Sequence, residues 1–166
     1  MAEITLKGNK IHICGKLPDL KKKAPDFLLT DKDLNDHTLK DYQSKPILLA
    51  TVPSLDTGVC STMTKHLNEF AKKHPKALVI VVSTDLPFAQ KRFCDNEKVQ
   101  NVVTLSMMRN KEFGKAYGLL IEDGPLAGIL ARSLIVLNDK HEVQHAELVP
   151  EITQEPKYAQ AFTYFG

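Results

Sequence analysis

The amino-acid sequence predicts an α/β fold in which helices flank a mixed central sheet, preceded by an N-terminal β-hairpin. Residues 3–14 alternate between apolar and polar side chains on either side of Lys7-Gly8-Asn9-Lys10, which predicts a hairpin with its turn at Gly8-Asn9. The stretches 46–52 and 77–83 are largely apolar, as expected of strands covered on both faces, and a helical repeat over 58–73 separates them. Strand, helix and strand in this order predict a parallel crossover, whose ligands gather at the carboxyl ends of the strands.

The other predicted elements extend this sheet and cover it. We expect a mixed sheet of about five strands with helices on both faces. In chain order, the remaining elements are a short hairpin at 27–29 and 38–39, a helix over 88–95, a strand at 102–105, a helix over 111–118, an antiparallel strand pair at 129–137 and 141–148, and an amphipathic helix from Pro156 to Phe165.

Length, charge and cysteine content limit the possible functions. With 166 residues the chain has the length of one domain, so residues 1–166 are expected to form a single domain. The formal net charge is +2, with Lys and Arg interspersed among Asp and Glu, which predicts neither nucleic acid nor a membrane as a partner. An odd number of cysteines (Cys14, Cys60 and Cys94) suits intracellular redox chemistry better than a secreted disulfide framework. Because residues 1–10 contain no signal-peptide core and no apolar run approaches about 20 residues, we expect a cytoplasmic protein.

Cys60 is the strongest candidate for a reactive residue. It follows the predicted strand 46–52 and a short loop, and the helical repeat behind it puts it in the first turn of a helix, with Thr57 or Gly58 near the N-cap. Unpaired backbone N–H groups and the helix dipole stabilise a thiolate at such a position. The sequence therefore predicts a nucleophilic thiol. The alternative is a cysteine packed as a small apolar side chain at a strand-helix junction.

The loop before Cys60 has side chains that suit a small electrophile. Thr57 stands three residues before the sulfur, so its hydroxyl can turn toward the thiolate and toward an oxygen atom beside it. Pro53 contributes a rigid wall without a competing N–H group.

Arg132 is a further candidate because it interrupts the apolar run 129–137. A buried guanidinium group needs an anion, and a thiolate would supply one. The alternative is an arginine at a strand end that reaches solvent.

The two other cysteines are open to more than one interpretation. Cys94 lies at or near the end of the predicted helix 88–95 and outside any Cys-x-x-Cys motif, so it is either half of a long-range pair or a buried structural thiol. Cys14, at the end of the first hairpin, has no second cysteine or clustered histidine near it in sequence, and we expect it to be structural.

Two segments of the chain resemble a known family. The spacing of Pro53, Thr57 and Cys60 resembles the active-site motif of the peroxiredoxins. The amino-acid sequence of 53–60 is similar to that motif in their thiol peroxidase branch, the atypical two-cysteine type. The segment 85–94 resembles the part of that branch that carries the resolving cysteine. Arg132 fits the family's arginine on a late strand beside the reactive cysteine. With these segments matched, the resemblance covers nearly the whole chain.

The resemblance implies a thioredoxin-like fold and a thiol-dependent peroxidase that reduces hydrogen peroxide and organic hydroperoxides in antioxidant defence. It makes Cys60 the peroxidatic cysteine, aided by Pro53, Thr57 and Arg132, and makes Cys94 the resolving cysteine of an intramolecular Cys60–Cys94 disulfide. It also implies thioredoxin as the reductant, a homodimer, and no metal, flavin or haem cofactor. Because each cysteine is expected on its own helix, we expect one or both helix ends to unwind when the disulfide forms.

One motif points to a different enzyme. His141-Glu142-Val143-Gln144-His145 matches the His-Glu-x-x-His signature of zinc metalloproteases. The signature works on a helix, where positions i and i+4 share a face, whereas on a strand the two histidines would lie about 13 Å apart. The stretch follows an Asn-Asp turn and shows little helical periodicity, so we interpret it as a strand with two exposed histidines and no metal.

Two other functions compete with a peroxidase. A cysteine hydrolase or transferase would need a histidine base beside Cys60, and none of the 6 histidines stands in a loop obviously poised there. A thioredoxin-fold redox interaction protein without peroxidase turnover would not need Pro53, Thr57 and Arg132 together with two cysteines.

Overall fold

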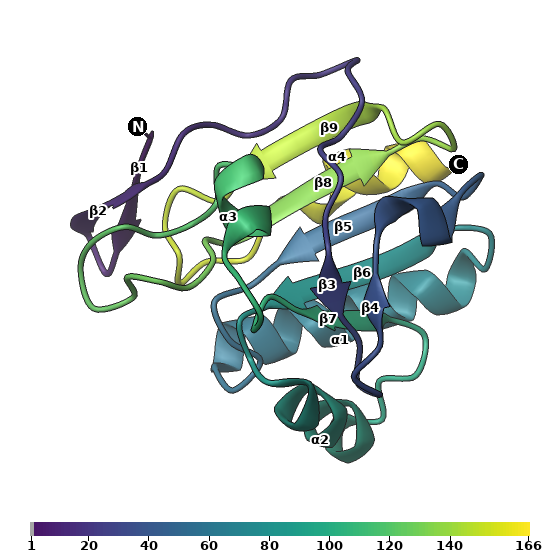
Figure 1. Ribbon diagram of the computed structural model, residues 1–166, viewed down its shortest axis with the longest axis horizontal. Coiled ribbons are helices and arrows are strands. Elements are labelled where there is room, and N and C mark those ends of the chain that lie inside the picture. Colours follow the sequence, from purple (N-terminus) through teal and green to yellow (C-terminus); the bar gives the residue numbers. More distant parts are fainter. Residues whose placement is uncertain (1) are drawn as a thin grey trace.

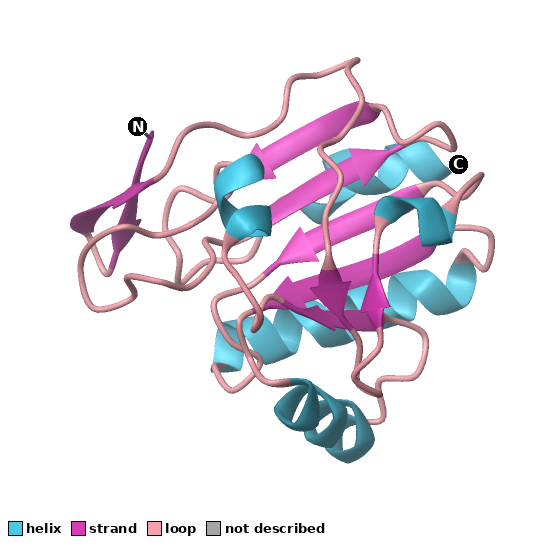
Figure 2. Cartoon of the chain, in the orientation of Figure 1, coloured by secondary structure: helices cyan, strands magenta, loops and turns pink. Residues whose placement is uncertain are grey.

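The protein is built on a seven-stranded mixed sheet with helices on both faces (Figure 1), as a computed structural model shows for residues 2–166. The strand order is β4-β3-β7-β6-β5-β8-β9, and β1 and β2 form a separate two-stranded hairpin beside it. Figure 2 distinguishes the helices from the strands by colour. The strands are β1 (Ala2–Leu6), β2 (Asn9–Ile13), β3 (Leu29–Thr30), β4 (Asp36–His37), β5 (Ile47–Thr51), β6 (Leu78–Ser83), β7 (Val103–Ser106), β8 (Ser133–Leu137) and β9 (Val143–Leu148). The helices are α1 (Gly58–Lys73), α2 (Pro87–Glu97), α3 (Glu112–Ala116) and α4 (Tyr158–Phe162), with 3₁₀ turns η1 (Leu39–Tyr42) and η2 (Thr163–Phe165).

Strand β5 forms the middle of the sheet and leads directly to the candidate site. All five of its residues are buried, because elements cover the sheet on both faces. It runs parallel to β6, to which α1 connects it, and antiparallel to β8. The parallel crossover that the sequence predicts is therefore confirmed, and α1 begins beside the carboxyl end of β5.

Two cores form because successive β5 side chains point to opposite faces. Leu48 and Ala50 pack with apolar side chains of α1, α2 and α4. Ile47 and Leu49 pack with the hairpin, α3 and the segment before β3. Figure 1 shows α3 on the near side of the sheet and α1 and α4 on the far side. Cys60 belongs to the core beneath α1.

The sheet is wider than the sequence predicts, and one strand is shorter. The two-residue strands β3 and β4 extend it on one side, since Thr30 pairs with Ser106 of β7. Such short strands carry too little alternation to be assigned to a sheet from sequence. At the other side, β8 begins at Ser133, so Arg132 precedes the strand and does not interrupt it.

The N-terminal hairpin is confirmed, with a different turn. Leu6 pairs with Asn9, so the turn lies at Lys7 and Gly8, and Asn9 is the first residue of β2. Both turn residues have positive φ, 50° and 82°, which the common two-residue hairpin turn requires.

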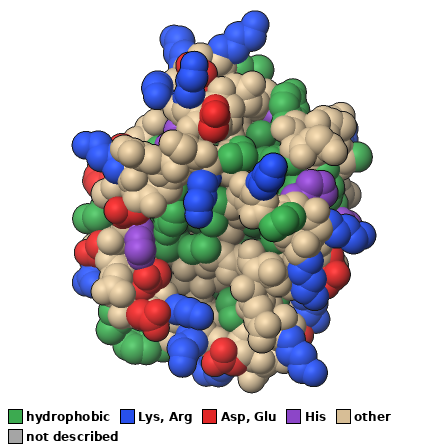
Figure 3. Space-filling view, turned by 90° about the vertical axis from the view of Figure 1, so that its right-hand side faces the viewer, with side chains coloured by type: hydrophobic (Ala, Val, Ile, Leu, Met, Phe, Trp, Pro, Cys, Tyr) green, Lys and Arg blue, Asp and Glu red, His purple; other side chains and the backbone are tan. Residues whose placement is uncertain are grey.

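The surface carries charges of both signs. Figure 3 shows Lys and Arg side chains mixed with Asp and Glu over one face. Within residues 2–166, no helix is long and apolar enough to cross a membrane.

Candidate active site

Cys60 lies in the first turn of α1 with a fully buried side chain (0% exposed). The N-cap of α1 is Thr57, whose side-chain oxygen accepts a hydrogen bond from the Cys60 backbone N–H at 3.4 Å. The sulfur therefore lies at the positive end of the helix dipole, where a thiolate is stabilised. The position that the helical repeat predicts for Cys60 is the one the structure shows.

Arg132 points one arm of its guanidinium group at this sulfur. Its Nη1 atom lies 3.3 Å from Cys60 Sγ, and the residue is only 2% exposed. Its Nε and Nη2 atoms donate to the Ile152 carbonyl at 3.0 and 2.8 Å. The remaining contact within residues 2–166 is Met63 Sδ at 3.7 Å, so none of these partners is a carboxylate. A thiolate at Cys60 would supply the anion that this buried cation needs.

Thr57 and Pro53 are also at the site, where the Thr57 hydroxyl makes hydrogen bonds within its own loop. The Thr57 hydroxyl donates to the Ser54 carbonyl at 3.1 Å while it caps α1. It therefore holds the loop closed rather than donating to the sulfur, because an N-cap oxygen must face the helix N–H groups. Pro53 is buried between the end of β5 and this loop.

The segment that holds Arg132 is fixed by the N-terminal hairpin. The Glu151 carboxylate accepts hydrogen bonds from the Thr5 hydroxyl, the Gly8 N–H and the Thr153 N–H, each at 2.9 Å. The Ile152 N–H donates to the Thr5 carbonyl, also at 2.9 Å. Hydrogen bonds from Thr153 and Gly8 lower the pKa of Glu151 from 4.5 to about 2. The carbonyl that orients Arg132 thus depends on a contact between the two ends of the chain.

Asp85 is a residue that the sequence did not single out. Its carboxylate accepts hydrogen bonds from the Ser54 hydroxyl and the Leu55 N–H, each at 2.8 Å, and from the Ser83 hydroxyl at 2.7 Å. Ser54 and Leu55 belong to the loop before Cys60, and Asp85 stands two residues before α2. A Ser-x-Asp turn between a strand and a helix was the available signal, but it reads as an ordinary helix cap.

Cys94 lies on α2 as predicted, and its buried side chain belongs to the same apolar core as Cys60. Both cysteines are free thiols. The Cys94 side chain lines a cavity of about 500 Å³ together with Thr104. The hollow of about 240 Å³ between the loop of Thr57 and α2 is lined instead by Phe93 and other α2 residues. Burial raises the pKa of the Cys94 thiol, and Thr104 and Lys32 act weakly in the opposite direction.

Cys14 and the His-Glu-x-x-His segment lie apart from this site. Cys14 Sγ is half-buried and donates to the Gly114 carbonyl at 3.5 Å. His141 stands in a turn with φ of 60° and His145 in β9, so the motif is not helical. Both histidines are half-buried rather than exposed as expected, and a His141 ring nitrogen lies 3.0 Å from the Tyr42 carbonyl oxygen. The described residues 2–166 include no group of His, Cys, Asp or Glu side chains placed to hold a metal ion.

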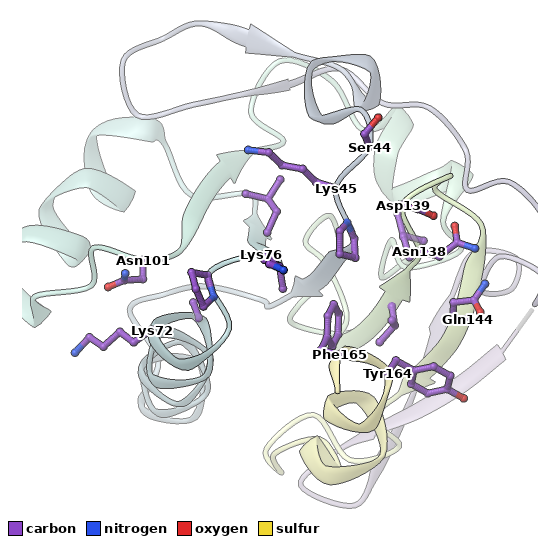
Figure 4. A pocket seen from close by; sticks show the side chains of 17 residues that line it. Ser44, Lys45, Lys72, Lys76, Asn101, Asn138, Asp139, Gln144, Tyr164 and Phe165 are labelled. Atoms are coloured by element: carbon purple, nitrogen blue, oxygen red, sulfur yellow. The ribbon is translucent and has the colours of Figure 1, made fainter.

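A cavity of about 860 Å³ lies at the other end of the sheet (Figure 4). It opens beside the start of β5, near Lys45 and Pro46, and is closed on one side by Tyr164 and Phe165. Cys60 follows the opposite end of β5, so this cavity is not part of the candidate active site.

Comparison with known proteins supports the resemblance. The Redoxin family profile matches residues 20–162. The chain is 47% identical over 163 residues to a thiol peroxidase of Leptospira interrogans, which covers 97% of this chain and 95% of that protein. It is 46% identical over 166 residues to a thiol peroxidase of Mycobacterium tuberculosis, which covers 100% of this chain and 99% of that protein. The crystal structure of a peroxiredoxin-like protein from Aquifex aeolicus matches with a TM-score of 0.93 and 39% identity, over 99% of this chain and 96% of that one.

These matches extend over nearly the whole chain and agree with the architecture described above. The helices on both faces of a mixed sheet, with a hairpin before it, form a thioredoxin-like fold, as the sequence predicts. The chain therefore belongs to the redoxin family and, within it, to the thiol peroxidase branch of the peroxiredoxins.

Proposed function

We propose that this protein is a thiol-dependent peroxidase that reduces hydrogen peroxide and organic hydroperoxides at Cys60, in antioxidant defence. The observation that carries the proposal is the contact of 3.3 Å between Arg132 Nη1 and the buried Cys60 sulfur at a helix N-terminus. A thiolate that is stabilised both by the helix N-terminus and by the Arg132 guanidinium group is an activated nucleophile that needs no histidine base.

In the first step the Cys60 thiolate attacks the terminal oxygen of the hydroperoxide. An S–O bond forms, the O–O bond breaks, and the leaving alkoxide or hydroxide takes up a proton. Cys60 is left as a sulfenic acid. Arg132 stabilises the charge that grows on the two oxygens, as donors of an oxyanion site do. Thr57 and Pro53 shape the place where the peroxide lies, and Thr57 also keeps the first turn of α1 in position.

In the second step the Cys94 thiol attacks the sulfur of the Cys60 sulfenic acid. An intramolecular disulfide forms and the oxygen leaves as water, after which thioredoxin reduces the disulfide by thiol exchange. Because Cys94 faces a different cavity from the Cys60 loop, this step needs a local rearrangement of α2. Two features of α2 make unwinding easy. Its N-cap, Leu86, makes no side-chain capping bond, and its C-cap, Lys98, is a non-glycine residue with a left-handed φ of 56°.

Further parts of the proposal rest on the family resemblance and on the sequence. We place the protein in the cytoplasm, as one domain over residues 1–166 that forms a homodimer. The two-step chemistry uses only protein sulfur and requires no metal, flavin or haem.

Three serine variants separate this function from its alternative, a redox interaction protein without peroxidase turnover. Cys60→Ser is expected to abolish peroxide reduction. Cys94→Ser is expected to consume about one equivalent of peroxide and then stop, because the sulfenic acid has no internal partner. Cys14→Ser is expected to cycle nearly normally. Peroxide consumption with and without thioredoxin measures all three. Turnover of Cys94→Ser with thioredoxin at the parent rate would remove Cys94 from the mechanism, and an inert parent protein would favour the interaction protein.

A further inference from the structure

A hydrogen-bonded group joins the Cys60 loop to the helix that carries Cys94. We call it the Asp85 clasp; its members are Ser54, Leu55, Ser83, Asp85 and Gln90. On one side the Asp85 carboxylate holds the Ser54 hydroxyl and the Leu55 N–H, each at 2.8 Å. Charge-assisted bonds of this length are stronger than neutral ones, and this pair fixes the loop that ends at the N-cap of α1.

On the other side the clasp fixes α2. The Ser83 hydroxyl donates to the same carboxylate at 2.7 Å, and its oxygen accepts from Gln90 Nε2 at 3.0 Å. Gln90 lies in the second turn of α2, is fully buried (0% exposed), and also donates to the Leu105 carbonyl at 2.9 Å. One carboxylate therefore links the loop before Cys60 with the helix of Cys94 through Ser83.

Outside the clasp, the N-terminal ends of α1 and α2 are weakly capped by side chains. The bond that caps the first turn of α1, from the Cys60 N–H to Thr57 Oγ1, is long at 3.4 Å. Helix α2 makes no side-chain cap at its start and has no basic residue in its last turn, while at its end the Lys98 and Val99 N–H groups donate to the Cys94 carbonyl. The clasp is therefore the network of side-chain hydrogen bonds that joins the loop before Cys60 to the start of α2.

We propose that Asp85 is a positioning residue that couples the folding of the Cys60 loop to that of α2, so that one opening event ends the peroxide step and starts the disulfide step. This inference rests on the proposed function, because it assigns the two steps to Cys60 and Cys94. With the clasp closed, Cys60 is aligned with Arg132, and Cys94 lines a cavity other than the hollow beside Thr57. With the clasp open, both helix ends are free to bring the sulfurs together.

The coupling sets a competition between two reactions of the sulfenic acid. In one, Cys94 sulfur bonds to Cys60 sulfur and water leaves. In the other, the sulfenic acid attacks a second hydroperoxide, gains an oxygen atom to become a sulfinic acid, and releases water or an alcohol. The second reaction needs the aligned site, so a clasp that stays closed longer favours overoxidation. Asp85 therefore helps to determine the hydroperoxide concentration at which Cys60 is overoxidised to the sulfinic acid.

Removing the Asp85 carboxylate should change the rates of sulfenic acid formation and of disulfide formation in opposite directions. In Asp85→Ala, stopped-flow kinetics should show sulfenic acid formation slowed about tenfold, because the site is less aligned. Disulfide formation should be about tenfold faster, because the bonds that oppose opening are lost. The fraction of sulfinic acid at high peroxide, measured by mass spectrometry, should fall. Slowing of both steps together, or a change in neither, would overturn the proposal.

Glu97→Ala is the matched control. Glu97 also joins the two helices, through a salt bridge of 2.9 Å to Lys65 of α1, but both side chains are exposed. Exposed pairs contribute little, so both rates should stay within about twofold of the parent values. If Glu97→Ala also slowed sulfenic acid formation and accelerated disulfide formation, as Asp85→Ala is expected to do, the effect would not be specific to the clasp.

Amide hydrogen exchange tests the coupling without the reaction. In the reduced protein, Asp85→Ala should lower the protection of residues 55–61 and of residues 88–97 together. Loss of protection in one segment alone would contradict the coupling, whatever the role of Cys94. If Asp85→Ala does not fold, Asp85→Asn keeps the size and one acceptor oxygen, and it should show the same opposite changes with smaller amplitude. The turnover of Cys94→Ser remains the separate test of the proposed function.

Discussion

The most informative single residue of the site is a buried arginine that has no carboxylate partner among residues 2–166. Arg132 is held by the Ile152 carbonyl through two nitrogens, which leaves Nη1 aimed at Cys60 Sγ. A neutral carbonyl fixes its direction but does not balance its charge. In the reaction that we propose, the cation is therefore available to the thiolate and to the oxygens of the transition state, and the low dielectric constant of its buried setting strengthens this interaction.

Replacing Arg132 by Met should slow the peroxide step about a hundredfold or more, by analogy with the loss of one oxyanion donor. The fold should persist, since Met fills the space of the aliphatic stem. Rapid-mixing measurements of sulfenic acid formation give the rate. Arg109→Met is the control, because Arg109 is an exposed arginine that pairs with Asp36 at 2.9 Å. Parent kinetics in Arg132→Met would assign Arg132 to the structure alone.

The hydroxyl of Thr57 is expected to matter more than its methyl group. Thr57→Val removes the cap of α1 and the bond to Ser54, so it should slow peroxide reduction and lower the free energy of unfolding by about 1 kcal/mol. Thr57→Ser keeps the oxygen and should behave nearly as the parent. Equal activity of Val and Ser at position 57 in a peroxide assay would show that the hydroxyl has no part in the reaction.

At the scale of the elements, periodicity could predict which helix holds each cysteine but not where each sulfur points. Helix α1 was predicted over 58–73 with the bounds that the structure shows, because its apolar repeat is regular and it follows a largely apolar strand. The orientation of Cys94 depends on how α2 packs against β7, and the Asp85 clasp depends on loops that meet in space. Neither leaves a periodic signal in the sequence.

Helix α2 should protect Cys94 in the reduced protein. Burial favours the neutral thiol and raises its pKa in the folded state. The stability that this thiol contributes is therefore fully present below its ordinary pKa of 9.0, and it is lost as pH rises through the raised value. Alkylation of Cys94 by iodoacetamide at pH 8 should be at least about tenfold slower in the folded protein than in urea. Equal rates would mean that α2 is already open.

At the scale of the whole molecule, the two ends of the chain meet behind the site. The hairpin β1–β2 contacts the segment of Glu151 and Ile152, and Ile152 in turn orients Arg132. The sequence predicted the hairpin but gave no sign of its partner, since the contact joins residues that are far apart in the chain. The hairpin thus acts as a support for the catalytic arginine that we propose.

Glu151 should make this support sensitive to acid. Its folded-state pKa of about 2 lies below the ordinary 4.5, so its contribution to stability is present above pH 4.5 and is lost as pH falls toward 2. Glu151→Gln should flatten the loss of thermal stability over that range, which calorimetry measures. Glu122→Gln, a change at an exposed carboxylate, is the control. Identical pH profiles for the parent and Glu151→Gln would contradict this role.

The most direct test of the central claim is to locate the first oxygen that the protein takes up. The reduced Cys94→Ser protein is treated with one equivalent of hydrogen peroxide, the sulfenic acid is trapped with dimedone, and the modified peptide is identified by mass spectrometry. The trapped residue should be Cys60, in nearly all molecules, and Arg132→Met in the same background should form it far more slowly. Dimedone on Cys14, or no trapped sulfenic acid while peroxide is consumed, would contradict the claim that Cys60 is the peroxidatic cysteine.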